Sequence, residues 1–431
     1  MELRQYESPV LKEIMYHGVD KSGLNVYILP KKGYSKSYAV FATHYGSIDS
    51  KFVVPGEDHV TEVPDGIAHF LEHKLFEEEE GNVFDKFSRL GVSANAFTSF
   101  NTTAYLFSCT DNFYESLDIL LNFVQNPYFT EESIQKEQGI IGQEIRMYDD
   151  DPNWRVFFNF LGALYHEHPV KKDIAGTIES ISKINKDILY KCYNTFYNPS
   201  NMLLFVLGDV DPKEVGEHVE HNLKIREPLK NEIKRLYPEE PPTIYQQKVE
   251  QNLSVSIPLF QMGFKDTDIG YGGSRLLKKD IITRILLEMI MGKSTPLYQN
   301  LYEQGLINDT FEVDFNAEVN YGFTIFGGES FNPEKVQQEM INEINRLQRD
   351  GLDEKVFERI KKVIFGRFLR QFNSVEKLAN TFVANLFRNI NLFDYIQTYE
   401  SITFNDVKER FTNHFKIDNM ALSVIKPYES N

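Results

Sequence analysis

The chain has 431 residues, of which 42% are hydrophobic and 25% are charged, and it carries a formal net charge of −17. This length suits two domains, and this composition excludes large-scale disorder. The acidic balance argues against a nucleic-acid-binding surface, and the sequence contains neither a signal-peptide pattern nor the ~18 consecutive apolar residues of a membrane span. We therefore expect a cytoplasmic protein without nucleic-acid or membrane partners.

The first elements in chain order are two strands and a helix. The β-rich runs 26–29 and 38–42 flank the turn signal Pro30–Ser35, so they predict a hairpin. A helix is expected from about Ile67 to Phe76, and the apolar residues interleaved along it indicate that it is partly buried.

A second hairpin and two long helices follow. The runs 94–99 and 104–108 are separated by a short polar stretch, which predicts a second pair of neighbouring strands. One helix is expected to begin near Phe113. Another is expected to begin at Thr130–Glu132, where a threonine in the capping position precedes acidic residues in the first turn.

The second half of the chain repeats this plan. Residues 307–327 resemble the hairpin region 91–108, and residues 406–424 resemble residues 187–206, including a shared Asn-Met pair. Chance similarity between two strand–helix stretches is the alternative explanation. The agreement in order and spacing favours a duplication.

The linker between the two copies is the charged, proline-containing stretch 224–242. We therefore expect two domains, at residues 1–228 and 240–431. Strand runs alternate with long helices and are joined by hairpins rather than crossovers. This pattern predicts an α+β fold with two homologous domains, each a mostly antiparallel β-sheet with helices packed on it.

Residues 69–73, His-Phe-Leu-Glu-His, carry the main chemical signal. In a helix, His69 and His73 project from one face, one turn apart, and Glu72 lies on nearly the same side. Two neutral imidazoles can hold zinc at ~2.0–2.1 Å. Glu72 could then act as the general base on a metal-activated water and return the proton to a leaving amine. The arrangement is the reverse of the HExxH motif of zinc peptidases.

The alternative is that these two histidines lie on the exposed face of a charged helix. The apolar residues on either side of them weaken that alternative, because they indicate partial burial. Buried imidazoles beside a buried carboxylate need partners. A metal ion is therefore the better explanation for the motif.

The wider sequence resembles the M16 (insulinase or pitrilysin-type) metallopeptidase family over nearly the whole chain. The resemblance rests on the HxxEH motif, on Glu137 and Glu144 further along the chain, and on residues 89–98. Shorter matches add to it at His168-Pro169, Gly176, residues 197–202 and Gly208-Asp209.

The resemblance implies one Zn²⁺ per chain, held by His69, His73 and Glu144. It also implies that Glu137 supports Glu144 without binding the metal. By themselves, two glutamates seven residues apart usually form a solvated stripe on a helix. After an HxxEH motif they become a specific signal.

The resemblance also implies a peptide substrate. In this family the substrate adds as an extra β-strand beside the metal. The match assigns that role to Asn95, Ala96, Phe97 and Thr98. The implied activity is a zinc metalloendopeptidase that cleaves short unfolded or leader-type peptides.

The sequence departs from the family pattern in the second domain. Many relatives carry there an arginine and a tyrosine that grip the substrate, whereas this chain has Tyr302 and Asn308 or Asp309 at those places. Two-domain relatives dimerise to close a chamber, so the resemblance implies a homodimer, or a heterodimer with a second M16-like chain that supplies the missing pair. The alternative function is a non-catalytic M16-like subunit that binds peptides or acts as a scaffold, although the zinc motif is intact.

Overall fold

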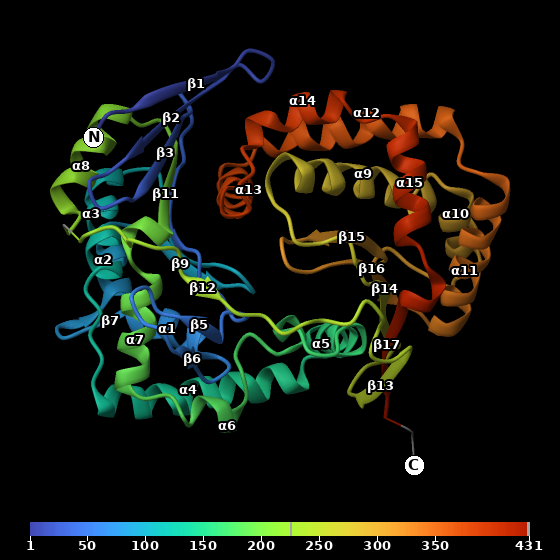
Figure 1. The fold of residues 1–431 in the computed structure, drawn as a ribbon, viewed down its shortest axis with the longest axis horizontal. Helices are drawn as coiled ribbons and strands as arrows, with labels where there is room; N and C mark the ends of the chain where they lie inside the picture. Colours follow the sequence, from blue (N-terminus) through green and yellow to red (C-terminus); the bar gives the residue numbers. More distant parts are fainter. Residues whose placement is uncertain (225, 429–431) are drawn as a thin grey trace. The chain divides into compact units, whose positions relative to one another are not determined.

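The computed structural model describes residues 1–224 and 226–428, which form two compact units (Figure 1). Unit 1 takes residues 1–145, 173–237 and 371–387, and unit 2 takes residues 146–172, 238–370 and those from 388 onward. The predicted domains, 1–228 and 240–431, follow the sequence repeat, whereas each compact unit also contains a helix from the other half of the chain. Among the described residues, the helices are too short or too polar to cross a bilayer.

The main sheet of unit 1 has seven strands within the described residues. In spatial order they are β1 (Arg4–Ser8), β2 (Glu13–Val19), β3 (Asn25–Pro30), β11 (Met202–Gly208), β4 (Ser37–Thr43), β10 (Thr103–Cys109) and β9 (Ser93–Thr98). β3 and β11 are parallel, and all other neighbours in this order are antiparallel. The sheet is therefore mostly antiparallel, as predicted. β9 lies at its edge, since β10 is its one neighbour among the described strands.

The first predicted hairpin is wrong in its pairing, although both of its strands form. β11 lies between β3 and β4 and bonds to both of them. Every residue of β11 is buried, because a continuous apolar strand is most stable in the middle of a sheet that is covered on both faces. The second predicted hairpin is confirmed, with Thr98 of β9 opposite Thr103 of β10.

Helices cover the sheet of unit 1. Those from the first half of the chain are α1 (Ile67–Leu75), α2 (Val83–Arg89), α3 (Phe113–Val124), α4 (Glu131–Asp150), α6 (Ile178–Ile181), α7 (Lys186–Phe196) and α8 (Pro212–Asn222). α1 confirms the predicted helix at 67–76. Thr130 caps α4 as predicted, because its hydroxyl accepts the Ser133 amide at 3.1 Å and the Ser133 hydroxyl accepts the Thr130 amide at 3.2 Å.

Short strands complete unit 1. They form two small sheets, one of β12 (Lys234–Arg235), β5 (Lys51–Val53) and β6 (Val60–Glu62), and one of β7 (Glu77–Glu78) and β8 (Gly81–Asn82).

The sheet of unit 2 repeats the central topology of unit 1. Within the described residues its order is β13 (Lys248–Leu253), β17 (Met420–Pro427), β14 (Leu259–Phe264), β16 (Gly322–Glu329) and β15 (Glu312–Ala317). β17 is parallel to β13 and antiparallel to β14, as β11 is to β3 and β4. Even single contacts recur: the His44 amide donates to the Asn201 carbonyl at 3.1 Å, and the Lys265 amide to the Asn419 carbonyl at 3.2 Å. The predicted pair of homologous domains is confirmed.

The helices of unit 2 come mostly from the second half of the chain. They are α5 (Pro152–Leu164), α9 (Gly273–Met291), α10 (Pro296–Glu303), α11 (Pro333–Asp350), α12 (Glu354–Gln371), α14 (Tyr395–Glu400) and α15 (Phe404–His414). α9 follows β14 and packs on β15 and α15. It therefore holds the place in chain order that α1 holds after β4.

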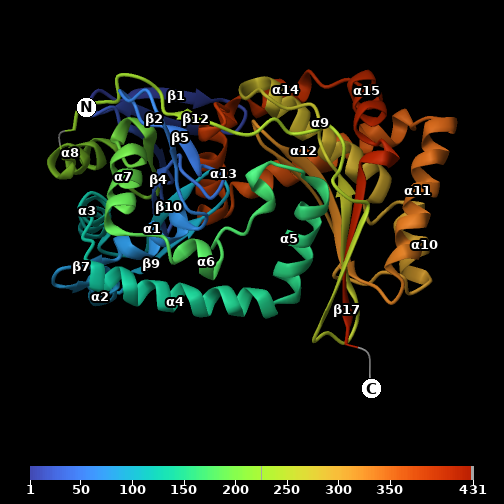
Figure 2. The same cartoon turned by 60° about the horizontal axis from the view of Figure 1, so that its bottom comes forward.

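The two halves of the chain exchange one equivalent helix. α4 continues into α5, which belongs to unit 2 and packs on β14 and β17 (Figure 2), where Val156 meets Leu253 and Ile425. α13 (Val375–Phe387) comes from the second half but packs on β4 and β11 of unit 1, where Phe382 stacks on Phe205 at 5.0 Å. Each unit therefore has a core that neither half of the sequence supplies alone.

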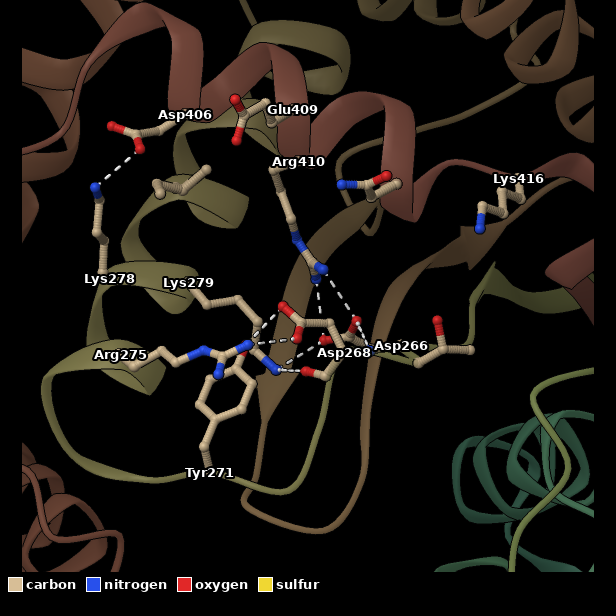
Figure 3. Close-up of a pocket in the computed structure, with 13 residues that line it drawn as sticks. Asp266, Asp268, Tyr271, Arg275, Lys278, Lys279, Asp406, Glu409, Arg410 and Lys416 are labelled. Carbon is tan, nitrogen blue, oxygen red and sulfur yellow. Dashed lines mark hydrogen bonds and ion pairs between the residues drawn. The ribbon is translucent and has the colours of Figure 1, made fainter.

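A buried ion cluster lies beside α9 in unit 2 (Figure 3). The guanidinium of Arg410 makes two hydrogen bonds to the Asp266 carboxylate, both of 3.0 Å, and the Lys279 ammonium lies 3.0 Å from the same carboxylate. The Arg410 Nε also donates to the Thr283 hydroxyl at 2.9 Å. An open cavity of about 680 Å³ borders this cluster. Each buried charge in it therefore has an opposite charge or a hydrogen-bond partner.

Candidate metal centre

α1 carries the HxxEH motif, and a glycine fixes where this helix begins. Gly66 precedes the helix with φ of +90°, and a Cβ there would come within 2.4 Å of the Ala175 carbonyl oxygen. Another residue would therefore clash as well as be strained. The apolar side of α1 is anchored in the core through Ile67, Phe70, Leu71 and Leu75.

The polar residues of α1 meet a carboxylate from α4. Nε2 of His69 lies 3.7 Å from one Glu144 carboxylate oxygen, and Nε2 of His73 lies 3.5 Å from the other. Possible ligand atoms of these three residues all lie within 4.8 Å of one another, and no other such group of three occurs among the described residues. The fold therefore brings together the three residues that the sequence assigned to zinc.

This donor set fits a zinc ion. A tetrahedral zinc with bonds of ~2.0–2.2 Å separates neighbouring ligand atoms by ~3.3–3.6 Å, close to the distances found here. His69 gives a second indication. Its Nδ1 is buried without a hydrogen-bond partner among the described residues, and the 3.7 Å from its Nε2 to Glu144 is too long for a hydrogen bond. A buried imidazole without hydrogen bonds is costly, and a cation between His69 and Glu144 would bind its Nε2 lone pair.

Glu137 contacts a histidine of the motif. Its Oε1 lies 2.9 Å from Nδ1 of His73, and Glu137 is buried. A proton on Nδ1 donated to this carboxylate leaves the Nε2 lone pair of His73 facing Glu144. Such outer carboxylates orient metal-binding imidazoles and increase their basicity. The sequence assigned Glu137 a supporting role for Glu144, and the contact seen here supports His73.

The electrostatics favour a cation among these residues. Burial lowers the pKa of His69 to about 4, and His73 adds to this effect, so His69 is neutral at pH 7. Burial alone would lower the pKa of His73, but its hydrogen bond with Glu137 and the charges of Glu72, Glu137 and Glu144 outweigh burial and raise that pKa. The region thus has a surplus of negative charge and one imidazole lone pair that is available at neutral pH.

Glu72 lies beside this group and has a hydrogen bond of its own. Its side chain is buried, and the Thr98 hydroxyl donates to its Oε2 at 2.8 Å. Burial raises the pKa of Glu72, whereas the Thr98 hydrogen bond and the charge of His73 oppose that rise. A carboxylate held next to these two imidazoles is suited to accept a proton from water.

The predicted peptide-binding residues lie on the edge strand β9. Asn95 and Phe97 are exposed, and Ala96 and Thr98 are half-buried on the opposite side of the strand. The Ala96 amide donates to the Asn95 side-chain oxygen at 2.9 Å, which indicates that this amide points away from β10. The contact between Thr98 and Glu72 was not predicted from the sequence. The strand alternation around Thr98 carried a signal for it, because residues 94, 96 and 98 must share one face.

Two parts of the chain match family descriptions. Residues 56–178 match the profile described as insulinase (peptidase family M16), and residues 183–364 match the one described as peptidase M16 inactive domain. The chain belongs to the M16 peptidase family, and its fold and histidine–glutamate cluster agree with that membership.

Relatives resemble the chain over its full length. The chain is 45% identical to YmfH of Bacillus subtilis, which is named an uncharacterized zinc protease, over 99% of both chains. A solved structure described as M16-like, from Alicyclobacillus acidocaldarius, superposes with a TM-score of 0.91 at 37% identity and covers 99% of this chain and 98% of its own. A Helicobacter pylori protease structure has a TM-score of 0.80 at 20% identity, covers 99% of this chain and all of its own, and supports the fold alone.

Proposed function

We propose that this chain is a zinc-dependent endopeptidase of the cytoplasm that cleaves short unfolded or leader-type peptides. The observation that carries the proposal is the convergence of His69, His73 and Glu144, with Glu72 held beside them. Names of relatives, including a zinc protease at 45% identity, support the same reaction class.

The residues divide the chemistry between them. His69, His73 and Glu144 would hold one zinc per chain, and Glu137 would orient His73. When bound, zinc lowers the pKa of a water molecule and polarises a carbonyl group. Glu72 accepts the proton of the attacking water and returns it to the leaving amine.

The peptide is proposed to bind along the free edge of β9, at Asn95–Thr98. Among the described strands, β9 has a neighbour on one side only, so its outer amides and carbonyls can pair with an added strand. The Ala96 amide, which now donates to the Asn95 side chain, is one such group. Main-chain pairing tolerates many side chains, which suits a processing peptidase.

Assembly is a second part of the proposal. Tyr302 on α10 is 47% exposed, whereas the Asn308 side-chain amide is engaged with the Glu329 carboxylate at 2.8 Å. Neither Asn308 nor Asp309 can provide the cationic contact of the arginine found in many relatives. We therefore propose a dimer that closes a chamber around the peptide, either of two copies or with a second M16-like chain that supplies the arginine and tyrosine.

The alternative function is a non-catalytic subunit that binds peptides or acts as a scaffold. The match of residues 183–364 to an inactive-domain description and the missing pair favour it. The complete set of His69, Glu72, His73 and Glu144 opposes it.

The test compares wild type with Glu72→Gln, each loaded with zinc, on a mixed set of short peptides. Glutamine keeps the shape of the side chain but cannot take the proton, so zinc content should stay the same while hydrolysis falls ~10²–10⁴-fold. Hydrolysis by Glu72→Gln within about tenfold of wild type would reject Glu72 as the base.

A titration separates the assembly models. Wild-type protein is assayed alone and then with an M16-like chain that carries the arginine and tyrosine. An increase in hydrolysis supports the shared site, full activity without the second chain supports the homodimer, and peptide binding without hydrolysis in either mixture supports the non-catalytic subunit.

A further inference from the structure

β9 ends with a polar side chain on its inner face. Along this strand the exposed residues are Ser93, Asn95 and Phe97, and the half-buried residues alternate with them. Thr98 therefore shares the inner face with two alanines, on the side of the strand that packs on α1. A threonine there brings a hydroxyl to a position where its neighbours on the strand are apolar.

The hydroxyl of Thr98 has one strong acceptor. Its Oγ1 lies 2.8 Å from Oε2 of Glu72 and 3.5 Å from the hydroxyl of Thr103. Thr103 donates its own hydrogen to the Tyr45 carbonyl at 2.9 Å. A hydroxyl has one hydrogen to donate, and a hydrogen bond to a carboxylate at 2.8 Å is far stronger than a contact at 3.5 Å. The Thr98 hydrogen therefore belongs to Glu72.

Glu72 depends on this one donor. Its carboxylate is buried, and the described residues offer it no other hydrogen-bond donor. A buried carboxylate that loses its only donor is left unsatisfied and has no fixed orientation about its terminal bonds.

The backbone that follows Thr98 is held in place by hydrogen bonds to two other segments. The Ser99 amide donates to the Thr102 carbonyl at 2.8 Å and closes the turn after β9. The amides of Ser47 and Ile48 donate to the carbonyls of Ser99 and Phe100 at 3.0 and 3.1 Å. Gly46 allows this approach, because a Cβ there would meet the Phe100 carbonyl oxygen at 2.2 Å. The donor is therefore carried by a rigid part of the fold.

We infer that Thr98 is a positioning residue that fixes the carboxylate of Glu72 and couples it to the strand on which the peptide is proposed to bind. The role of Glu72 in this inference rests on the proposed function, whereas the contact itself belongs to the fold. The backbone of Thr98 lies in the peptide-binding edge, and its side chain holds the base. A threonine is well suited to both tasks, because β-branching restricts its χ1 torsion and favours an extended backbone.

The test uses two variants that differ in the hydroxyl. Thr98→Val keeps the branched shape and removes the donor, and Thr98→Ser keeps the donor. For Thr98→Val we expect kcat to fall ~10- to 100-fold, with KM within about threefold of wild type and zinc content unchanged. The melting temperature should fall about as far as in a variant that loses a neighbouring buried hydroxyl, because Glu72 loses its buried donor. Thr98→Ser, which keeps the donor, should retain most of the wild-type kcat. The inference is overturned if Thr98→Ser loses as much kcat as Thr98→Val. It is also overturned if the kcat of Thr98→Val stays within about threefold of wild type.

Two further measurements separate this role from others. The Kd of a labelled peptide for the metal-free protein should be the same for wild type and Thr98→Val, and a weaker Kd with unchanged kcat would make Thr98 a peptide-binding residue only. Thr103→Val is the matched control, because it removes a neighbouring buried hydroxyl that does not contact Glu72. It should lower the melting temperature and leave kcat within about threefold of wild type.

A structural readout keeps the inference testable if the proposed function fails. If zinc-loaded wild-type protein hydrolyses no peptide, crystal structures of wild type, Thr98→Val and Thr98→Ser decide the question. A Glu72 carboxylate in one orientation in wild type and Thr98→Ser, and displaced in Thr98→Val, supports the inference. An identical Glu72 orientation in all three overturns it.

Discussion

Unit 1 and unit 2 repeat one strand topology but differ in the residues that pair with their buried carboxylates. Beside α1, the carboxylates of Glu72 and Glu137 lie near two imidazoles and have no lysine or arginine partner among the described residues. Beside α9, which holds the equivalent place in chain order, the Asp266 carboxylate is bound by Arg410 and Lys279 (Figure 3).

The difference separates a group of residues that is suited to hold a cation from a cluster in which Arg410 and Lys279 supply the positive charge. α1 presents His69, Glu72 and His73, whereas the early turns of α9 present Arg275, Lys278 and Lys279. Cationic side chains cannot bind a metal ion, and in the second copy they neutralise the buried carboxylate instead. The duplication thus preserved the scaffold, while the chemistry of this helix diverged.

Removal of a metal ligand should have the largest effect. We expect His73→Ala to reduce bound zinc from about one per chain to nearly none, because two ligands hold a zinc ion far more weakly than three. Zinc is measured by elemental analysis of the purified protein. His59→Ala, which removes an exposed histidine outside the cluster, is the control and should keep its zinc. Full zinc occupancy in His73→Ala would reject the ligand assignment.

Disruption of the buried cluster of Asp266, Arg410 and Lys279 should instead lower the free energy of unfolding. Asp266→Asn leaves Arg410 and Lys279 without their buried counter-charge, which should cost about 3–5 kcal/mol of unfolding free energy. Trp154, the one tryptophan of the chain, lies on α5 in unit 2, so its fluorescence during urea unfolding reports on this unit. Zinc content should not change.

The control for this variant is Lys278→Gln, on the same helix. Lys278 pairs with Asp406 at 2.8 Å in a partly exposed position, so its loss should cost no more than about 1 kcal/mol. Equal effects of the two variants would contradict the account of the Asp266 cluster as a buried, mutually dependent set of charges.

A smaller effect is expected in the pH dependence of unit 2. Burial, with Arg410 and Lys279 adding to it against the opposing charge of Asp266, lowers the pKa of His414 to about 4 from an ordinary 6.5. Between these two pH values His414 is protonated in the unfolded chain but neutral in the folded protein. The free energy of unfolding therefore falls as pH decreases from 6.5 towards 4. His414→Gln should remove up to ~3 kcal/mol of this acid-dependent loss. Urea midpoints at pH 7 and pH 4.5, followed by Trp154 fluorescence, measure it. An unchanged difference between the two midpoints would contradict the assignment.

Much of the site was predictable because it is encoded in local spacing. His69 and His73 lie one helical turn apart whatever surrounds the helix, and the resemblance added Glu144. The contact between Thr98 and Glu72 was missed, because it depends on which face of β9 packs on α1. Glu137 was predicted to support Glu144, and its partner in the structure is His73.

The sequence by itself determined the repeated elements, the α+β class, the family and the pair of histidines that face one way from α1. Strand and helix periodicity and capping residues act over a few residues, so they can be read without knowledge of the fold. The insertion of β11 between β3 and β4 and the exchange of α5 and α13 were decided by the tertiary structure alone. The strand insertion and the helix exchange both bury apolar faces against segments far apart in the chain, as where Phe205 packs on Phe382. A local sequence pattern shows that a face is apolar, but it does not specify which distant segment packs on it.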